Sequence, residues 1–240
     1  MAEYQSEFGE LKVFEDFLGV NPDATWAVGG FDIGAVSVTS VNEGSIETTV
    51  DESGGVIAIT TDTADNDNAA LYVGVFQPSK GPIVMEARVK MASASTSSLF
   101  IGFAETLAKD TPVMPAEFAT TTMTHNPGGH VGLVWDIDAT TDDWRAAFGD
   151  GSAATGSNDA TRANSALVAD TWDIVRVEID PDGVGRTYLN GKLVASSVTA
   201  AVTPADLFHA VVLTENRTAA ANVMEVDYFY AKGYRDWAND

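Results

Sequence analysis

The sequence predicts an all-β protein, a β-sandwich or jelly roll of two antiparallel sheets. Apolar and polar residues alternate along many short segments. Residues 83–91 show this best, because Ile83, Met85 and Ala87 fall on one face and charged residues on the other. Such a period of two is typical of strands buried on one face. Clusters of Gly, Pro, Asn and Asp separate the segments, and a helical period is nearly absent. Many short strands joined by turns predict a sandwich.

The expected strands run from residue 33 almost to the C-terminus. They are residues 33–41, 44–50, 56–61, 69–76, 83–91, 97–104, 130–137, 144–148, 172–179, 185–189, 192–198, 208–214 and 224–232. Residues 115–118 and 204–207 are expected to form short helical turns, because each segment begins with a proline, which suits the first position of a helix. We expect helical structure only at these two places.

Residues 172–194 predict two consecutive hairpins, the second closed by Asn190-Gly191. Asn-Gly between apolar runs favours a type I′ turn, because both central residues of that turn need a positive φ. The turn fixes the register of the strands, so that Val175 points to the core and Arg176 points away from it.

A single domain is expected, since sandwiches often reach the length of this chain of 240 residues. Residues 1–13 are polar with scattered aromatic residues and predict a short N-terminal arm. The sandwich then covers residues 14–236, and residues 237–240 form a C-terminal tail. Residues 105–129 and 149–171 are rich in small residues and poorly periodic. Loops of such length are usually functional, so we expect them to be contact surfaces.

Composition excludes several classes of protein. The chain has 35 acidic and 13 basic residues and a formal charge of −22. This charge repels phosphate backbones, so no direct nucleic-acid contact is expected. The absence of cysteine excludes thiolate zinc sites and disulfides. The N-terminus lacks the features of a secretory signal, and no stretch approaches the ~20 apolar residues of a membrane helix. A protein made in the cytoplasm, with no membrane contact, is expected.

The hairpin region and the last expected strand resemble the concanavalin A-like lectin/glucanase superfamily. The likeness lies in Trp172-Asp-Ile-Val-Arg-Val-Glu-Ile, in Tyr188-Leu-Asn-Gly-Lys-Leu-Val and in Val223-Met-Glu-Val-Asp-Tyr-Phe-Tyr. The resemblance implies a concanavalin A-like jelly-roll sandwich. It is nearly silent on function, because this fold carries many functions.

A second likeness covers most of the chain. The segments are FEDFLG (14–19), NAAL from Asn68, GPIVMEARVKM (81–91), LFIGFAE (99–105), VGLVWDIDA (131–139) and VDYFYAKGYR (226–235). Together they resemble a class of tailed-bacteriophage virion proteins. This resemblance implies a non-enzymatic capsid decoration or cement protein, made in the host cytoplasm, that binds the major capsid protein on the capsid exterior and stabilises the shell. A homo-oligomer is expected, and a trimer would match the three-fold positions of a shell.

The main alternative is a carbohydrate-binding adhesin or head-fibre module, which needs aromatic side chains beside polar groups. The available aromatic residues include Trp26, Trp135, Trp144, Trp172, Trp237, Tyr188 and Tyr234. Trp135 shares a strand face with Leu133 and Ile137 and is expected in the core. Trp144, close to Asp142, is the expected exposed platform for a sugar.

Asp62, Asp65 and Asp67 form the candidate metal site. Calcium takes six to eight oxygen ligands, which crowded loop carboxylates and carbonyls can supply. Because Asp is also favoured in turns for local reasons, a purely structural role is the alternative. His125 and His130 flank a glycine turn without a convincing third ligand and are expected to be ordinary loop residues.

No catalytic residues and no required cofactor are expected. Retaining glycosidases need a pair of carboxylates at a fixed separation, and in related sandwiches these sit at alternate positions of one strand. Glu225 and Asp227 share a face, but the third carboxylate of that pattern is missing. A Gly-x-Ser-x-Gly elbow and a glycine-rich nucleotide loop are missing as well. We therefore expect a protein that is not an enzyme.

Overall fold

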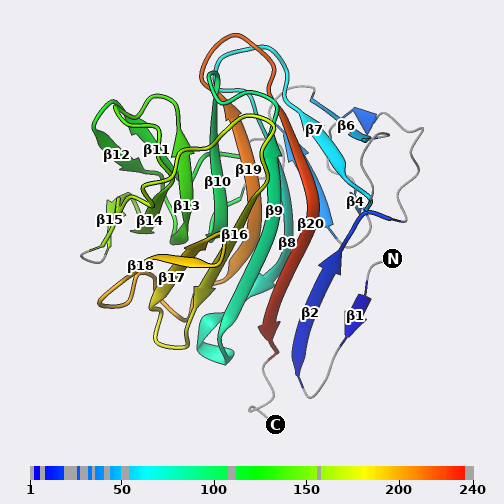
Figure 1. Ribbon diagram of the computed structural model, residues 1–240. Helices are drawn as coiled ribbons and strands as arrows, with labels where there is room; N and C mark the ends of the chain where they lie inside the picture. The colour runs from blue at the N-terminus through cyan, green and yellow to red at the C-terminus, as the bar shows by residue number, and fades with distance from the viewer. Residues whose placement is uncertain are drawn as a thin grey trace.

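The protein folds into two β-sheets packed face to face (Figure 1). This computed structural model describes residues 3–5, 9–18, 26–27, 32–33, 36–40, 44–49, 54–107, 112–155 and 158–235. These ranges contain strands and a single short 3₁₀ helix, η1 (Pro78–Lys80). The predicted all-β sandwich of two antiparallel sheets is confirmed. Across the same ranges, no helix has the length and apolar character needed to span a membrane.

The larger sheet has ten strands. Its main path runs β18-β17-β16-β9-β20-β7-β6-β3, and β2 pairs with β20 and with β1. The bounds are β1 (Glu3–Gln5), β2 (Glu10–Glu15), β3 (Trp26–Ala27), β6 (Ser45–Thr48), β7 (Ile57–Thr60), β9 (Ile83–Met91), β16 (Asp173–Ile179), β17 (Gly185–Leu189), β18 (Lys192–Ser196) and β20 (Val223–Tyr234). The second strand of the chain, β2, thus lies beside the last one, β20, in the same sheet.

The smaller sheet has eight strands in the order β15-β14-β13-β10-β19-β8-β5-β4. The bounds are β4 (Asp32–Ile33), β5 (Val36–Ser40), β8 (Asn68–Phe76), β10 (Ser97–Ala104), β13 (His130–Asp136), β14 (Arg145–Asp150), β15 (Ala153–Ala154) and β19 (Phe208–Asn216). A separate hairpin consists of β11 (Ala116–Ala119) and β12 (Thr122–His125).

Both predicted helical turns are wrong. Residues 116–119 form strand β11, whose Phe118 lies opposite Met123 of β12 and is buried. Residues 204–207 form a turn without helix, and the helical turn starts instead at Pro78. A proline marks a suitable helix start only where helix follows, and here burial of the hairpin's apolar side chains favours the extended form.

The boundary expected after residue 13 falls inside strand β2. Residues Glu10 to Glu15 pair with Tyr234 to Phe229 of β20, so residues 10–13 belong to the sheet rather than to an arm. The expected tail, residues 237–240, and residues 1–2 and 6–8 of the expected arm lie outside the described residues. The type I′ turn is confirmed, since Asn190 and Gly191 have φ angles of 50° and 77°.

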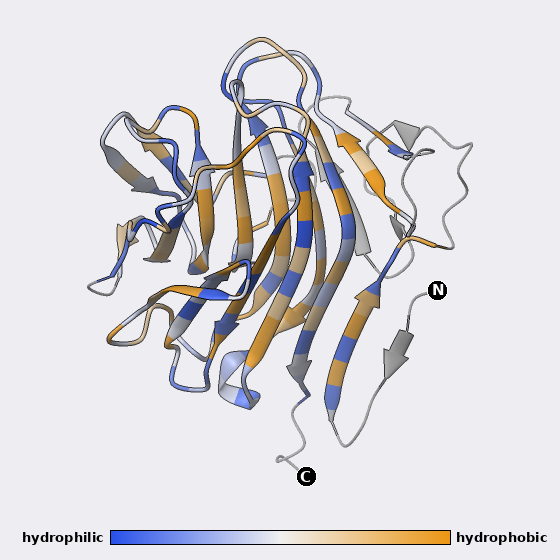
Figure 2. Cartoon of the chain, in the orientation of Figure 1, coloured by the Kyte–Doolittle hydropathy of each residue, from blue (hydrophilic) through white to orange (hydrophobic). Residues whose placement is uncertain are grey.

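The main core lies between the two sheets. Strand β9 buries every second residue, as its alternation predicts, and alternating apolar and polar bands are visible along β9 and β20 (Figure 2). The largest fully buried side chains include Trp135, Trp144, Phe76, Phe100, Phe103, Phe148, Phe208 and Phe229. Each such side chain contributes about 1.5–3 kcal/mol by leaving water. The predicted core position of Trp135 is confirmed.

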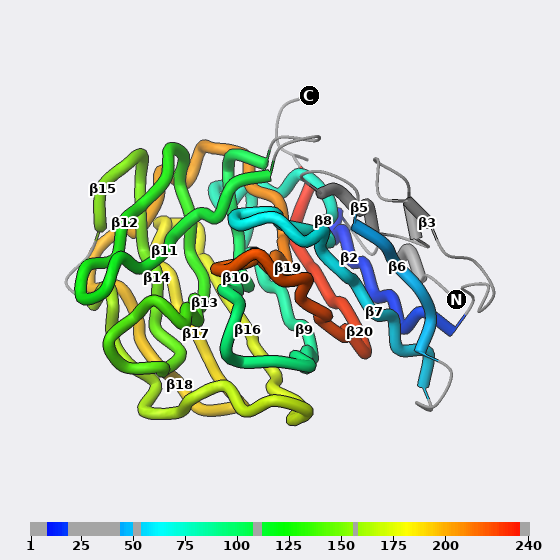
Figure 3. The backbone as a smooth tube through the Cα atoms, turned by 90° about the horizontal axis from the view of Figure 1, so that it is seen from above, coloured from blue at the N-terminus to red at the C-terminus, as the bar shows by residue number. Residues whose placement is uncertain are grey.

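A second apolar cluster covers the outer face of the eight-stranded sheet, the face turned away from the main core. The sheet supplies Ala70, Phe100, Ala104, Val134, Ala147, Val211 and Leu213, and residues 114–118 and Ala139 supply the cover. Seen from above, β11 and β12 lie beyond β13 and β14, on the side away from β16 and β17 (Figure 3). Residues 112–126, part of a loop expected to be a contact surface, therefore bury this face.

Candidate functional site

Trp144 is not the exposed platform that the sequence predicts. Its side chain is fully buried, and its Nε1 donates a hydrogen bond of 3.0 Å to Oδ2 of Asp173. A buried indole needs such an acceptor for its N–H group. Asp142, the acidic neighbour predicted to line the sugar site, is exposed in the turn before β14. The structure therefore separates these two residues, because the chain turns Trp144 inwards.

Asp62, Asp65 and Asp67 do not converge on a common point. Asp67 is buried, and its Oδ2 accepts a hydrogen bond of 2.9 Å from the backbone of Ala64. Asn216 donates to the carbonyls of Asp62 and Ala64. In the described part of the chain, no group of three or more His, Cys, Asp or Glu side chains could hold a metal ion. The acidic run closes a turn, which is the alternative that the sequence left open.

His125 and His130 are joined in a buried hydrogen-bonded chain. His125 Nδ1 lies 2.8 Å from His130 Nε2, and His125 Nε2 lies 3.2 Å from Oδ2 of Asp159. His130 Nδ1 donates to the carbonyl of Gly128. Burial and the neighbouring His125 lower the pKa of His130 to about 4. His130 is therefore neutral at pH 7, and because its Nδ1 donates to Gly128, its Nε2 is the acceptor in the contact with His125 Nδ1.

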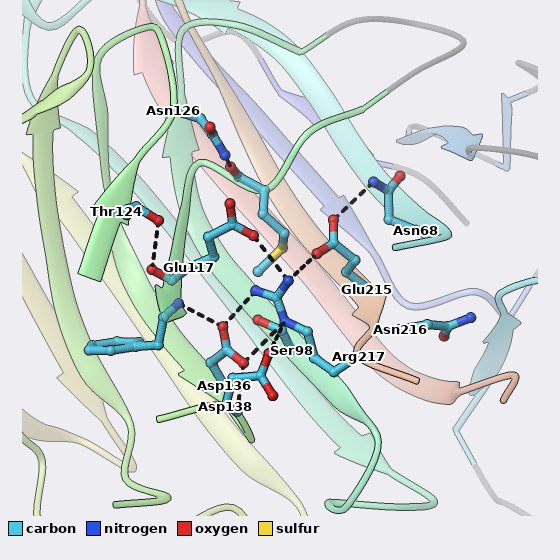
Figure 4. Close-up of polar contacts among 12 residues, drawn as sticks. Asn68, Ser98, Glu117, Thr124, Asn126, Asp136, Asp138, Glu215, Asn216 and Arg217 are labelled. Atoms are coloured by element: carbon cyan, nitrogen blue, oxygen red, sulfur yellow. Dashed lines mark hydrogen bonds and ion pairs between the residues drawn. The ribbon is translucent and has the colours of Figure 1, made fainter. Parts of the chain in front are cut away.

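A cluster of carboxylates surrounds Arg217 at the other end of the same sheet face (Figure 4). Its floor is one row across four strands, in which Asp136 faces Ser98, Ser98 faces Glu215 and Glu215 faces Asn68. Arg217 bridges this row to the hairpin. Its guanidinium contacts Asp136 at 2.6 Å, Glu215 at 2.8 Å and Glu117 at 3.0 Å.

The Arg217 cluster is a structural network rather than an open site. Arg217 is 6% exposed and Asp136 is fully buried. Asp136 also accepts a hydrogen bond from the backbone of Phe118, which fixes β11 over the sheet. Burial raises the pKa of Glu215 to about 7, although Arg217 acts in the opposite direction. Each of these charges has its partner within the cluster, so the network offers little to a ligand.

The outer face of the ten-stranded sheet is charged and open over strands β17, β16, β9, β20 and β2, which we call the five-strand face. Together with Asp180, which directly follows β16 and pairs with Arg186, it bears six acidic side chains and six basic ones. The acidic residues are Glu10, Glu86, Glu178, Asp180, Glu225 and Asp227, and the basic ones are Lys12, Arg88, Lys90, Arg176, Arg186 and Lys232. Because these charges cancel, the whole formal charge of −22 belongs to the rest of the chain. Sequence alternation predicts the outward charges but not this balance.

Glu225 and Asp227 lie on this face as paired charges. Glu225 contacts Lys90 at 2.7 Å and Asp227 contacts Arg88 at 2.5 Å. A bulge between Val226 and Tyr228 interrupts the register of β20 beside them. This arrangement agrees with the outward charges expected from the sequence, since each carboxylate already has a basic partner.

A hollow of about 540 Å³ opens on the five-strand face above β16 and β17. It is lined by Glu86, Ile174, Arg176, Glu178, Tyr188, Asn190 and Gly191. Arg176 Nε donates to Glu178 at 2.8 Å, and the Tyr188 hydroxyl donates to the other oxygen of Glu178 at 3.3 Å. The ring and the polar groups are thus held in fixed positions around the hollow. An aromatic face beside fixed donors and acceptors is what binding of a small polar ligand needs.

Neither a protein-family model nor a curated protein sequence matches the chain. Several solved structures are similar to the chain in fold. A protein of unknown function from Shewanella oneidensis MR-1 has a TM-score of 0.62 at 18% identity, covering 99% of this chain and 92% of that chain. The carbohydrate recognition domain of Emp47p has a TM-score of 0.58 at 12% identity, covering 92% and 94%. Alginate lyase Aly36B, in complex with alginate trisaccharide, has a TM-score of 0.53 at 12% identity, covering 95% and 99%.

These likenesses define the class of fold. The chain has the concanavalin A-like lectin/glucanase sandwich, as its hairpin and closing strand predict. At such low identity the comparison concerns the fold alone. The predicted virion role stays a prediction.

Proposed function

We propose that the protein is a non-catalytic glycan-binding module that holds its ligand in the hollow beside Tyr188. The observation that carries this proposal is the juxtaposition there of an aromatic ring, a guanidinium and two carboxylates on one rigid sheet. Arg176 lies between Glu178 and Glu86, at 2.8 Å and 3.7 Å. Three strands of a regular sheet hold these groups, so little ordering is needed when a ligand binds.

The chemistry of the hollow suits a neutral, hydroxyl-rich ligand. An aromatic ring can pack against the apolar C–H face of a sugar, while carboxylates accept and a guanidinium donates hydrogen bonds to hydroxyl groups. The hollow contains two carboxylates and one guanidinium, in a protein of formal charge −22. An anionic sugar would meet repulsion both locally and from the whole molecule. We therefore expect a neutral glycan.

Two structural neighbours support this proposal. Emp47p contributes a domain named for carbohydrate recognition, and the Aly36B structure holds a trisaccharide. The sandwich fold is thus compatible with carbohydrate binding. The proposal for this chain rests on the residues of its own hollow.

A glycan array followed by titration calorimetry tests the proposal. The intact protein should bind neutral glycans and should ignore uronate-containing ones. Tyr188→Ala should weaken binding about tenfold or more, which corresponds to ~1.4 kcal/mol. Tyr234→Ala is the matched control, because Tyr234 lies on the same sheet face at the end of β20, outside the hollow. Binding that survives Tyr188→Ala unchanged would contradict the assignment of the site.

Decoration of a phage capsid is the second candidate, and the charge distribution favours it. The five-strand face is charge-balanced and carries aromatic residues such as Trp172, whose ring lies 4.3 Å from Arg88 and 4.8 Å from Lys90. A charge-balanced face can approach a partner surface of either sign without net electrostatic repulsion. Co-sedimentation with purified capsids tests this candidate. A ratio of about one copy for each major capsid subunit would support capsid decoration. If the protein does not co-sediment with capsids, this candidate is wrong.

A further inference from the structure

We infer that the ligand of the hollow is an extended glycan chain that crosses the strands from Tyr188 to Tyr230, rather than a single terminal sugar. This inference rests on the proposed function, because it extends the same site. It names the shape of the ligand and a second aromatic contact outside the hollow.

One continuous row of side chains connects the two rings. Tyr188 of β17 faces Arg176 of β16, Arg176 faces Glu86 of β9, and Glu86 faces Tyr230 of β20. Residues opposite one another in antiparallel strands present their side chains on the same face. Neighbouring strands lie roughly 4.8 Å apart, so the two tyrosines are about 14 Å apart along the row.

The row has aromatic residues at its ends and charged residues in its middle. An aromatic ring stands at each end, and the Arg176–Glu86 pair lies between them at 3.7 Å. Glu86 also accepts a hydrogen bond of 2.8 Å from the Tyr228 hydroxyl, which fixes the carboxylate in the middle of the row. A single pyranose ring is shorter than the roughly 14 Å between the two tyrosines. A ligand that meets both rings must therefore be a chain of several sugars.

The far end of the row is a broader aromatic platform. Phe14 of β2 faces Tyr230 in the register of the sheet, and its ring centroid lies 6.2 Å from that of Tyr228. Lys12 lies 5.7 Å from the centroid of the Tyr230 ring. The rings of Phe14, Tyr228 and Tyr230 are all partly exposed. A glycan chain bound at Tyr188 can therefore contact aromatic rings again beyond the charged middle of the row.

Charge also favours a neutral chain along this path. Three basic groups, Lys12, Arg176 and Lys232, and three acidic ones lie beside the row. Arg176 pairs with Glu86 and Glu178, and Lys232 pairs with Glu10. No excess of positive charge attracts an anionic polymer to these strands. Hydrogen bonds to hydroxyl groups and packing on rings remain as the sources of affinity.

The test is a length series of neutral oligosaccharides, cello-, manno- and xylo-oligosaccharides of one to six sugars, titrated into the intact protein. Affinity should rise about tenfold or more between the shortest ligand that binds and a chain of four or five sugars. Tyr230→Ala should abolish this rise and leave the affinity for the shortest ligand unchanged. Tyr188→Ala should weaken every ligand, and Tyr234→Ala, about 13 Å along β20 from Tyr230, should weaken none. Circular dichroism and thermal unfolding verify that each variant folds.

Each outcome decides between the two proposals. An affinity that does not depend on length, or a rise that survives Tyr230→Ala, overturns the extended chain and leaves the proposed glycan binding intact. Binding of no oligosaccharide at any length removes both. Analytical sedimentation of the same variants tests the remaining possibility, that the row is an interface between copies of this chain. If Tyr230→Ala dissociates an oligomer, the row is an interface between copies of this chain, and the inference falls.

Discussion

Arg217 and Asp136 form a two-point ion pair that connects the end of β19 to the end of β13. Arg217 Nη2 lies 2.6 Å and Nε lies 3.1 Å from the two carboxylate oxygens of Asp136, and the side chains are 6% and 0% exposed. The same carboxylate receives the backbone N–H of Phe118. The pair therefore fixes the β11–β12 hairpin on the sheet as well as the two strands.

Removing the guanidinium should strongly destabilise the fold. Arg217→Met leaves Asp136 and Glu215 buried without their basic partner, and breaking a buried pair in this way costs about 3–5 kcal/mol. Arg162→Met is the control, because Arg162 is 44% exposed and its ion pair with Asp143 is partly in water. Such a pair contributes about 0–1 kcal/mol. Urea unfolding measures both variants, and equal losses would show that burial does not decide the cost.

Glu215 should make the protein less stable as the pH rises to neutrality. Burial raises the pKa of its carboxyl from 4.5 to about 7, despite the opposing effect of Arg217. Between these values the folded state keeps a proton that the unfolded state has lost, so the stability from this group is present at low pH and is lost as the pH rises through about 7. Glu215→Gln should remove a decline of up to roughly 3 kcal/mol. Thermal unfolding from pH 4.5 to 7.5 checks this, and parallel curves for both proteins would refute it.

His130 should have the opposite effect. Burial, followed by the charge of His125, lowers the pKa of His130 from 6.5 to about 4. The unfolded state then binds more protons between these values, so stability from this group rises with pH through that window. In wild-type protein this rise offsets part of the decline due to Glu215, so His130→Gln should make that decline steeper. The double variant with Glu215→Gln should vary least with pH over this window, and a larger variation than in either single variant would contradict the assignment.

The strands can be predicted from the sequence, whereas the ion pair of Arg217 with Asp136 cannot. The period of two in residues 83–91 specifies β9, because one local pattern decides which side chains are buried. No local pattern points to Arg217, whose partner Asp136 is 81 residues away in the chain. Trp144 misleads for a related reason, because its charged neighbours suggest a surface position. Its partner Asp173 is 29 residues further on. Tertiary pairing therefore decides the sites, and local pattern decides the strands.

The hollow can be predicted in part from the sequence. Alternation already predicts that Arg176 and Glu178 point away from the core, and Tyr188 follows the same period on the next strand. Their meeting with Glu86 depends on β9 pairing with β16, which brings residues 86 and 176 opposite each other. The sequence thus supplies the outward side chains, and the strand order assembles them.

Gly149→Ala should disrupt the histidine chain. A methyl group at this position would come within 2.3 Å of His130 Cε1 and 2.8 Å of His125 Nδ1, so the stacked rings would have to move. Overpacking of this kind costs about 1–3 kcal/mol. Gly151→Asn is the control, because nothing lies within 4 Å of a side chain at Gly151 and Asn tolerates its φ of 65°. Similar unfolding midpoints for the two variants would argue against the close packing of the rings on Gly149.

Gly191→Val should destabilise the protein through backbone conformation alone. A Cβ at this position has no neighbour within 4 Å, so there is no clash to relieve. The φ of 77° is the source of the cost, about 1–2 kcal/mol for a residue with a Cβ. Gly191→Asn should lose less, because Asn accepts a left-handed conformation more readily. Unfolding in urea separates the two, and identical losses would mean that loss of glycine itself, rather than the type I′ geometry, governs this turn.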